Sequence, residues 1–138
     1  MKNFIFAIIF LTPLFGKTQS SKSPLVDIII ASIATDPANL KDIIKIDPYK
    51  FEKDKIYYYL TDIETTFIKG ITDGSATYYM PYSENLLKEI LYEFTLRKFS
   101  IESEDDKLFV ANSKLFFFVY EQESKIIIFG MEHSKVPK

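Results

Sequence analysis

The chain contains no cysteine and no tryptophan, and its only histidine is His133. Without cysteine, there can be no disulfide, thiol nucleophile, thiolate-held iron–sulfur cluster or cysteine zinc site. One histidine also falls short of the sets of nitrogen ligands that transition-metal sites commonly use. The sequence therefore predicts neither a metal nor another cofactor.

Glycine and proline are scarce, with four and six residues, whereas phenylalanine and tyrosine number 13 and 9. This balance is typical of a packed domain and not of a disordered chain. Because no disulfide can form, the stability of the domain must come from burial of apolar and aromatic side chains.

The sequence has no apolar run long enough to cross a membrane as a helix. The longest candidate, Phe4–Phe15, follows Lys2 and precedes the small polar segment GKTQS. This pattern is typical of a secretory signal peptide, whereas a membrane-spanning helix needs about 20 residues. We expect cleavage between Ser20 and Ser21, export to the periplasm or the exterior, and no stable membrane span afterwards. A retained anchor is the alternative.

The chain also lacks an excess of basic residues. Residues 1–20 hold two of the 17 basic residues and no acid, so 15 basic and 19 acidic residues remain after cleavage, a net charge of −4. Such a chain offers no electrostatic attraction for a phosphate backbone, so we expect no nucleic-acid partner. Residues 21–138 have the length of one domain.

Three Ser-Pro or Asp-Pro pairs mark chain positions where helices can begin: Ser23-Pro24, Asp36-Pro37 and Asp47-Pro48. The side-chain oxygen can accept a first-turn N–H, and proline at the next position loses no hydrogen bond. The pairs predict helices from 24 to about 34 and from 36 to about 45, then a short turn or a break near 48. The first helix is apolar around most of its circumference, which predicts deep burial or a partner.

Strand patterns follow. Alternating apolar residues and the Asp73-Gly74 turn predict strands near 55–61, 65–71 and 75–80. A helix over 54–69 is the competing interpretation, because Ile56, Leu60, Ile63 and Phe67 would share a helical face.

The clearest helix follows Ser83, which can cap it, and its apolar stripe consists of Leu87, Ile90, Leu91 and Phe94. Four further strands are expected at 98–103, 107–112, 114–122 and 125–131, separated by turn-prone groups. Both faces of the 114–122 strand are apolar, which predicts a central strand covered on both sides.

These elements predict a single α+β domain over residues 21–138, in which N-terminal helices and one long central helix pack on a curved antiparallel sheet. In the order of its elements alone, the chain resembles the cone-shaped folds of the nuclear-transport-factor-like or cystatin-like kind. Such folds carry both enzymes and inert binding proteins.

Few residues suggest catalysis. We expect His133 to be a solvated residue near the C-terminus, and the acid-rich stretch Glu102–Asp106 to be a solvated turn, because it lacks the glycine of a calcium loop. Asp62, Glu64 and Asp73 could meet across neighbouring strands as an acid pair of the kind that glycosidases use.

The tyrosine clusters are the best-located candidate site. Tyr57 and Tyr59 share a strand face, Tyr78 or Tyr79 can join them from the hairpin partner, and Tyr82 follows. Tyrosine combines a broad apolar ring with a polar tip and suits interfaces. The five residues form either a groove for a ligand or part of the core.

Two main functions are compatible with the sequence. The first is an exported, non-enzymatic binding protein, of an inhibitor or immunity type, acting on a protein or a small ligand through its tyrosines. The alternative is a small hydrolase or isomerase that uses carboxylates and tyrosine in a cone-shaped cavity. A third hypothesis, an exported structural subunit, requires self-association through the first helix.

Overall fold

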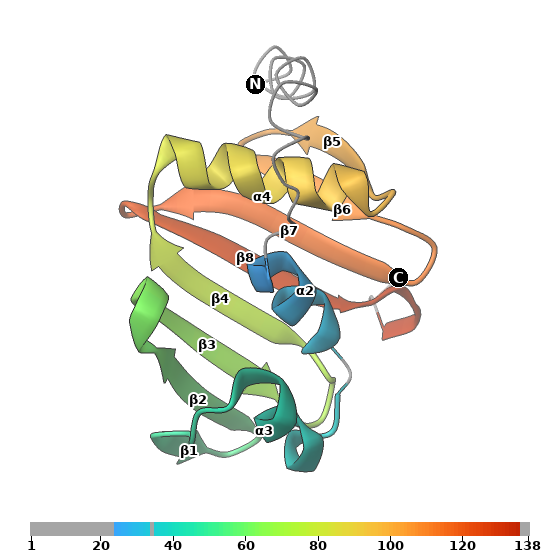
Figure 1. Ribbon diagram of the computed structural model, residues 1–138. Helices are drawn as coiled ribbons and strands as arrows, with labels where there is room; N and C mark the ends of the chain where they lie inside the picture. The colour runs from blue at the N-terminus through green and yellow to red at the C-terminus, as the bar shows by residue number, and fades with distance from the viewer. Residues whose placement is uncertain (1–23, 34, 136–138) are drawn as a thin grey trace.

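The computed structural model describes residues 24–33 and 35–135, and Figure 1 shows its arrangement. The expected signal peptide, residues 1–20, lies outside the described residues. The helices are α2 (Pro24–Ala31), α3 (Pro37–Ile44) and α4 (Glu84–Leu96), with short 3-10 turns η1 (Thr61–Ile63) and η2 (His133–Lys135). The strands are β1 (Lys50–Glu52), β2 (Lys55–Leu60), β3 (Thr65–Gly70), β4 (Ala76–Pro81), β5 (Ser100–Glu104), β6 (Lys107–Ala111), β7 (Leu115–Gln122) and β8 (Lys125–Glu132).

All eight described strands form one antiparallel sheet in the order β1-β2-β3-β4-β8-β7-β6-β5. The sheet is open, with β1 and β5 at its two edges. Two four-stranded runs therefore meet where β4 pairs with β8, and α4 connects them. The predicted α+β class is confirmed, whereas the likeness to the nuclear-transport-factor-like and cystatin-like folds rests on element order.

The strand interpretation of residues 55–70 is confirmed, and the competing helix over 54–69 is wrong. Register explains why the strand pattern wins: Tyr58 pairs with Phe67, and Phe67 pairs with Tyr78. The three rings form a stacked ladder, with centroids 5.3 Å and 4.6 Å apart. A helix would scatter these side chains over different faces.

The first strand, β1, was not expected from the sequence. Asp47-Pro48 starts no helical turn, and the three residues after Tyr49 instead pair with β2. All three β1 residues are exposed, so they show no apolar alternation. The turn that follows uses Lys53 at a φ of 49°, without the glycine that commonly signals such a turn.

Two of the three proline pairs mark a helix start correctly, at Pro24 and Pro37. Helix α3 begins at Pro37, yet the Asp36 side chain makes no capping hydrogen bond. The helix ends at Ile44, and the left-handed C-cap residue Lys45 donates its N–H to the Lys41 carbonyl. Helix α2 ends at Ala31, three residues earlier than expected.

Helix α4 matches its prediction closely. The Ser83 hydroxyl accepts a hydrogen bond from the Leu86 N–H at 3.2 Å, which caps the first turn. Ile90, Leu91 and Phe94 are buried, and Phe94 contacts Phe117 of β7 with ring centroids 4.9 Å apart. The apolar stripe therefore anchors α4 on the second half of the sheet.

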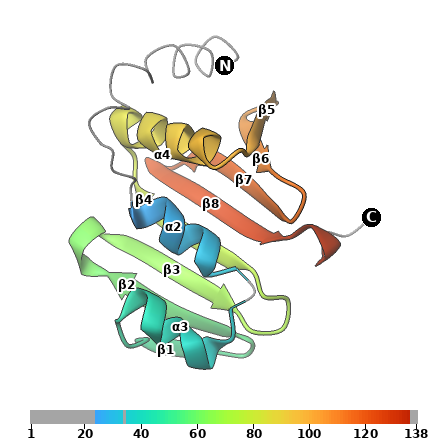
Figure 2. The same cartoon turned by 45° about the vertical axis from the view of Figure 1, so that its right-hand side comes forward.

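The three helices lie on the same face of the sheet, as Figures 1 and 2 show from two directions. Helix α3 covers the half that begins with β1, α4 covers the half that ends with β5, and α2 lies between them. Val26 and Ile29 of α2 are fully buried there. Its exposed Asp27 is held by Arg97 at the end of α4, with a nitrogen–oxygen distance of 2.9 Å.

A buried polar cluster joins α2 to the sheet. Lys69 of β3 is 1% exposed, and its ammonium donates to the carbonyl oxygens of Ser32 and Gly74 at 2.8 Å and 3.0 Å. The Tyr78 hydroxyl donates to the Ser32 hydroxyl at 2.8 Å, and that hydroxyl donates to the Ile29 carbonyl. These bonds satisfy polar groups that would otherwise be costly to bury.

Gly130 of β8 should be intolerant of any side chain. A Cβ at this position would lie 2.5 Å from the Phe117 ring and 2.8 Å from Cδ1 of Ile33. Because both neighbours are buried, we expect Gly130→Ala to lower the free energy of unfolding by about 1–3 kcal/mol, measured by urea denaturation.

The double substitution Gly130→Ala with Phe117→Leu provides the control. If the ring causes the loss, the second change should make the alanine less costly than it is in the wild-type background. Equal costs in both backgrounds would contradict the steric explanation.

Candidate binding face

The side chains on the second face of the sheet point away from all three helices. In β7, Leu115, Phe117 and Val119 belong to the helix side, because Phe117 contacts Phe94. Successive side chains alternate along a strand, so Phe116 and Phe118 point to the opposite side. The expectation that this strand is covered on both sides is therefore wrong for the described part of the chain, although β7 does lie inside the sheet.

Aromatic side chains run across this open face in rows. Cross-strand partners in register lie on the same face, so the pairing gives the members of each row directly. One row consists of Tyr59, Thr66, Tyr79, Ile127 and Tyr120, and a second consists of Tyr57, Ile68, Thr77, Phe129, Phe118 and Phe109. We call these two rows, together with Phe116, the aromatic face.

The phenylalanines of the aromatic face contact one another at its β6–β7–β8 end. Phe118 lies at the centre, with its ring centroid 4.9 Å from those of Phe109 and Phe116 and 6.4 Å from that of Phe129. None of the four is fully buried. At the margin, the exposed His133 contacts Phe116, with ring centroids 5.6 Å apart. His133 is thus an exposed residue next to the aromatic face.

Three of the five predicted site tyrosines lie on the aromatic face. Tyr57 and Tyr79 are half-buried, and Tyr59 is 45% exposed. The structure brings Tyr59 and Tyr79 into one row with Thr66 between them. The hydroxyl group of each tyrosine is therefore available to hydrogen-bond a partner, while the apolar ring packs on the sheet.

Charged neighbours surround Tyr57 at the β1 end. Its hydroxyl donates to the Glu52 carboxylate at 3.0 Å, and the Lys50 ammonium lies 4.9 Å from its ring centroid. The hydrogen bond to Glu52 raises the pKa of Tyr57, with partial burial adding to the effect. At the other end of the face, burial raises the pKa of Tyr120, and the Lys107 ammonium lies 5.3 Å from that ring.

The other two predicted tyrosines lie elsewhere. Tyr78 is fully buried in the core among the helices, and burial raises its pKa far above the usual range. Tyr82 is 40% exposed on the segment between β4 and α4, where it lines a pocket on the helix side of the sheet. Tyr78 and Tyr79 are adjacent in sequence, and the strand places them on opposite faces.

The phenylalanines of the aromatic face were missed as site residues. The sequence did show Phe116, Phe118 and Tyr120 on one side of a strand. It gave no sign of which side the helices would take, because the opposite side is equally apolar. The number of expected helices was the one available signal. Three helices are few for eight strands, so one face of the sheet could be expected to stay uncovered.

Of the three acids suggested for a catalytic pair, Asp73 lies apart from Asp62 and Glu64. Asp62 and Glu64 lie at the turn between β2 and β3, whereas Asp73 lies at the other end of β3. There, the Asp73 carboxylate accepts a hydrogen bond from the Ser75 N–H at 2.9 Å. This bond lowers the pKa of Asp73 against the opposing effect of partial burial, with Lys69 contributing.

Within residues 24–33 and 35–135, no three acidic or histidine side chains are grouped closely enough to hold a metal ion. The described helices include none with the length and apolarity needed to cross a membrane.

Comparison with protein-family models, curated proteins and solved structures finds no match for this chain. Its function must therefore be argued from its own surface.

Adjacent tyrosines on opposite faces provide a test of this assignment. We expect Tyr78→Ala to lower the free energy of unfolding by about 3–5 kcal/mol, because it empties a core site. We expect Tyr79→Ala to cost about 1 kcal/mol or less, because its ring borders solvent. Urea denaturation of both variants measures the difference, and equal losses would contradict the assignment of the two faces.

Proposed function

We propose that the chain is an exported, non-enzymatic binding protein whose aromatic face docks a protein partner, as an inhibitor or immunity-type protein does. The observation that carries the proposal is the concentration of tyrosine and phenylalanine on the one sheet face that the helices leave open. The aromatic side chains of this face are partly exposed, and Tyr59 is 45% exposed. A patch of exposed apolar surface commonly marks an interaction site.

The shape of the aromatic face favours a protein over a small molecule. The row from Tyr59 to Tyr120 crosses five adjacent strands, a width of about 19 Å at the usual strand spacing. Small ligands bind in concave sites that enclose most of their surface, whereas protein interfaces are broad. Aromatic residues at the centre of such interfaces supply much of the binding energy.

Charges at the margins of the face can orient the partner. Lys50 and Glu52 lie at the β1 edge and form an ion pair at 3.6 Å. Lys107 lies at the other end, over Tyr120. A polar rim around an aromatic centre is the arrangement found in many protein interfaces, where rim charges govern specificity and the rate of association.

Export is supported by the sequence of residues 1–20 alone. A chain without cysteine can work in an oxidising compartment without disulfide exchange. The alternative function, a carboxylate-dependent hydrolase or isomerase, gains no acid pair across neighbouring strands, because Asp73 lies at the opposite end of β3 from Asp62 and Glu64. The buried acid Glu93 is paired with Arg97 at 2.7 Å and so has a structural role.

A photo-reactive amino acid placed at two matched positions tests the proposal. Benzoylphenylalanine at Tyr59 samples the aromatic face, and the same residue at Leu96 samples an equally exposed apolar site on α4. After irradiation in the cells that produce the protein, we expect a discrete cross-linked adduct from position 59 and none from position 96. Mass spectrometry of the adduct identifies the partner.

Two results would count against the proposal. The same adducts from both positions would show that the face has no special role. An adduct between two copies of this chain would show that the aromatic face binds a second copy and not a different protein.

A further inference from the structure

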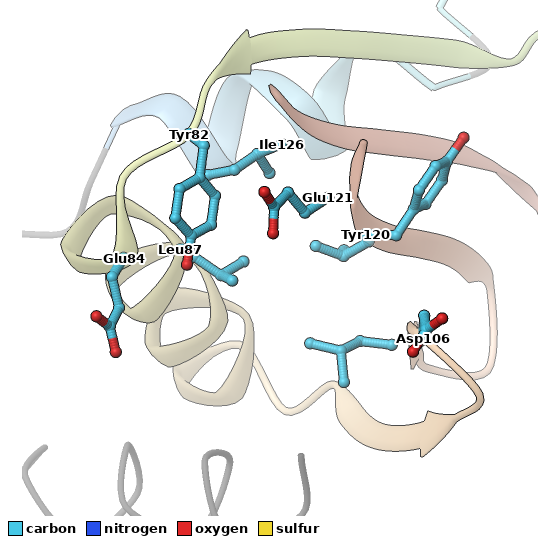
Figure 3. A pocket seen from close by; sticks show the side chains of 9 residues that line it. Tyr82, Glu84, Leu87, Asp106, Tyr120, Glu121 and Ile126 are labelled. Atoms are coloured by element: carbon cyan, nitrogen blue, oxygen red, sulfur yellow. The ribbon is translucent and has the colours of Figure 1, made fainter. Parts of the chain in front are cut away.

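A second candidate site lies on the helix side of the sheet, away from the aromatic face. A pocket of about 490 Å³ lies between the first turn of α4 and the ends of β6, β7 and β8, as Figure 3 shows. Pockets that take small molecules commonly have volumes of about 300–1,000 Å³. Tyr82 stands at its margin, and its N–H donates to the Ser124 carbonyl at 3.0 Å. This bond fixes the margin to the β7–β8 turn.

The floor of the pocket is apolar. Leu108, Val119 and Ile126 come from three adjacent strands and are at most 4% exposed. Leu87 of α4 lines the wall and is half-buried. Contact with such a floor stabilises a bound ligand that has an apolar body, because apolar surface is then removed from water on both sides. It contributes little to the binding of a fully hydrated ion.

The margin of the pocket is acidic. Glu84, Asp106 and Glu121 line it, and Figure 3 shows the Glu121 carboxylate directed toward the hollow. Among the described residues, neither Asp106 nor Glu121 forms an ion pair, whereas Glu84 has the ammonium of Lys88 at 3.8 Å. The partial positive charge of the α4 N-terminus is offset by the Ser83 cap and by Glu84 in the first turn.

The nearby lysines of the sheet point to the other side. Strand alternation places Tyr120 on the aromatic face, and Lys107 lies over its ring. Lys125 pairs with Gln122 and Pro81, whose side chains also belong to that face. Tyr120 is among the residues that line the pocket, but Figure 3 shows its ring turned away from the hollow. The sheet thus separates the carboxylates of the pocket from these two ammonium groups.

We propose that this pocket binds a small organic cation, an amine or guanidine with an apolar body. The apolar floor would hold the body, and the carboxylates of Glu121 and Asp106 would attract the charged end. A lone metal ion does not suit the site, because in the described part of the chain its three carboxylates are not grouped closely enough to hold one. The proposal is independent of the partner on the aromatic face, since the two sites lie on opposite sides of the sheet.

Titration of the isotope-labelled protein with hexylamine, followed by nuclear magnetic resonance, tests the proposal. We expect saturable shifts of the amides of Leu87, Leu108 and Ile126, whereas hexanoate, with the same chain length and the opposite charge, should cause none at equal concentration. Equal responses to the two probes would overturn the requirement for a cation. Unchanged pocket amides with hexylamine would overturn the site itself.

Two matched variants distinguish attraction by the carboxylate of the pocket from attraction by the net charge of the protein. We expect Glu121→Gln to weaken hexylamine binding about three- to fivefold, the range expected for one partly exposed charge pair. Glu89→Gln removes an exposed acid of α4 that does not line the pocket, and binding should not change. Equal weakening in both variants would show that net charge, and not the pocket, attracts the probe.

Discussion

The structure depends on the way three helices cover an eight-stranded sheet. The sheet has two faces, and both carry apolar side chains. Helices α2, α3 and α4 all pack on the same face. The helix side can therefore be a conventional core, with the Tyr58–Phe67–Tyr78 ladder in one half and Phe94 against Phe117 in the other. The second face keeps its aromatic residues at the surface, which is the physical basis for the proposed binding role.

Pairing of β4 with β8 joins the two halves of the sheet, and α2 is attached over this junction. This eight-residue helix is too short to be stable alone, so its position must come from tertiary contacts. Its apolar side chains supply the burial, and the Ser32 carbonyl bound to Lys69 fixes its end. Asp27 and Arg97 then tie it to α4. A lysine inside the core is costly unless it is bonded, and the ammonium of Lys69 donates to the carbonyls of Ser32 and Gly74.

Much of the fold could be predicted because local rules agree with the final structure. The Ser83 cap, the stripe of α4 and the Asp73-Gly74 turn each have one good local solution. The alternation of residues 55–60 competed with a helical pattern, and pairing with β3 decides in favour of the strand. Strand β1 could not be predicted, because its exposed residues show no pattern and its turn uses Lys53 in place of glycine. Asp36 failed as a cap although its position was right.

The candidate site was predictable only in part, for a different reason. Alternation shows which residues share a strand face, but the side that the helices choose depends on the whole chain. Tyr57 and Tyr59 were therefore grouped correctly with each other, while the choice between Tyr78 and Tyr79 as their neighbour stayed open, and the structure places Tyr79 with them and Tyr78 in the core. The pocket was invisible in sequence, because Glu84, Asp106 and Glu121 come from three separate elements.

Hydroxyl-radical footprinting tests the central claim most directly, namely that the aromatic face is open in the isolated chain and covered in its working state. Oxidation would be measured for the chain alone and for the chain in extracts of its own producer. We predict protection of Tyr59, Tyr79 and Phe118 in the extract, with no change at Leu96 on the helix side. Equal oxidation of these face residues in both samples would contradict the account.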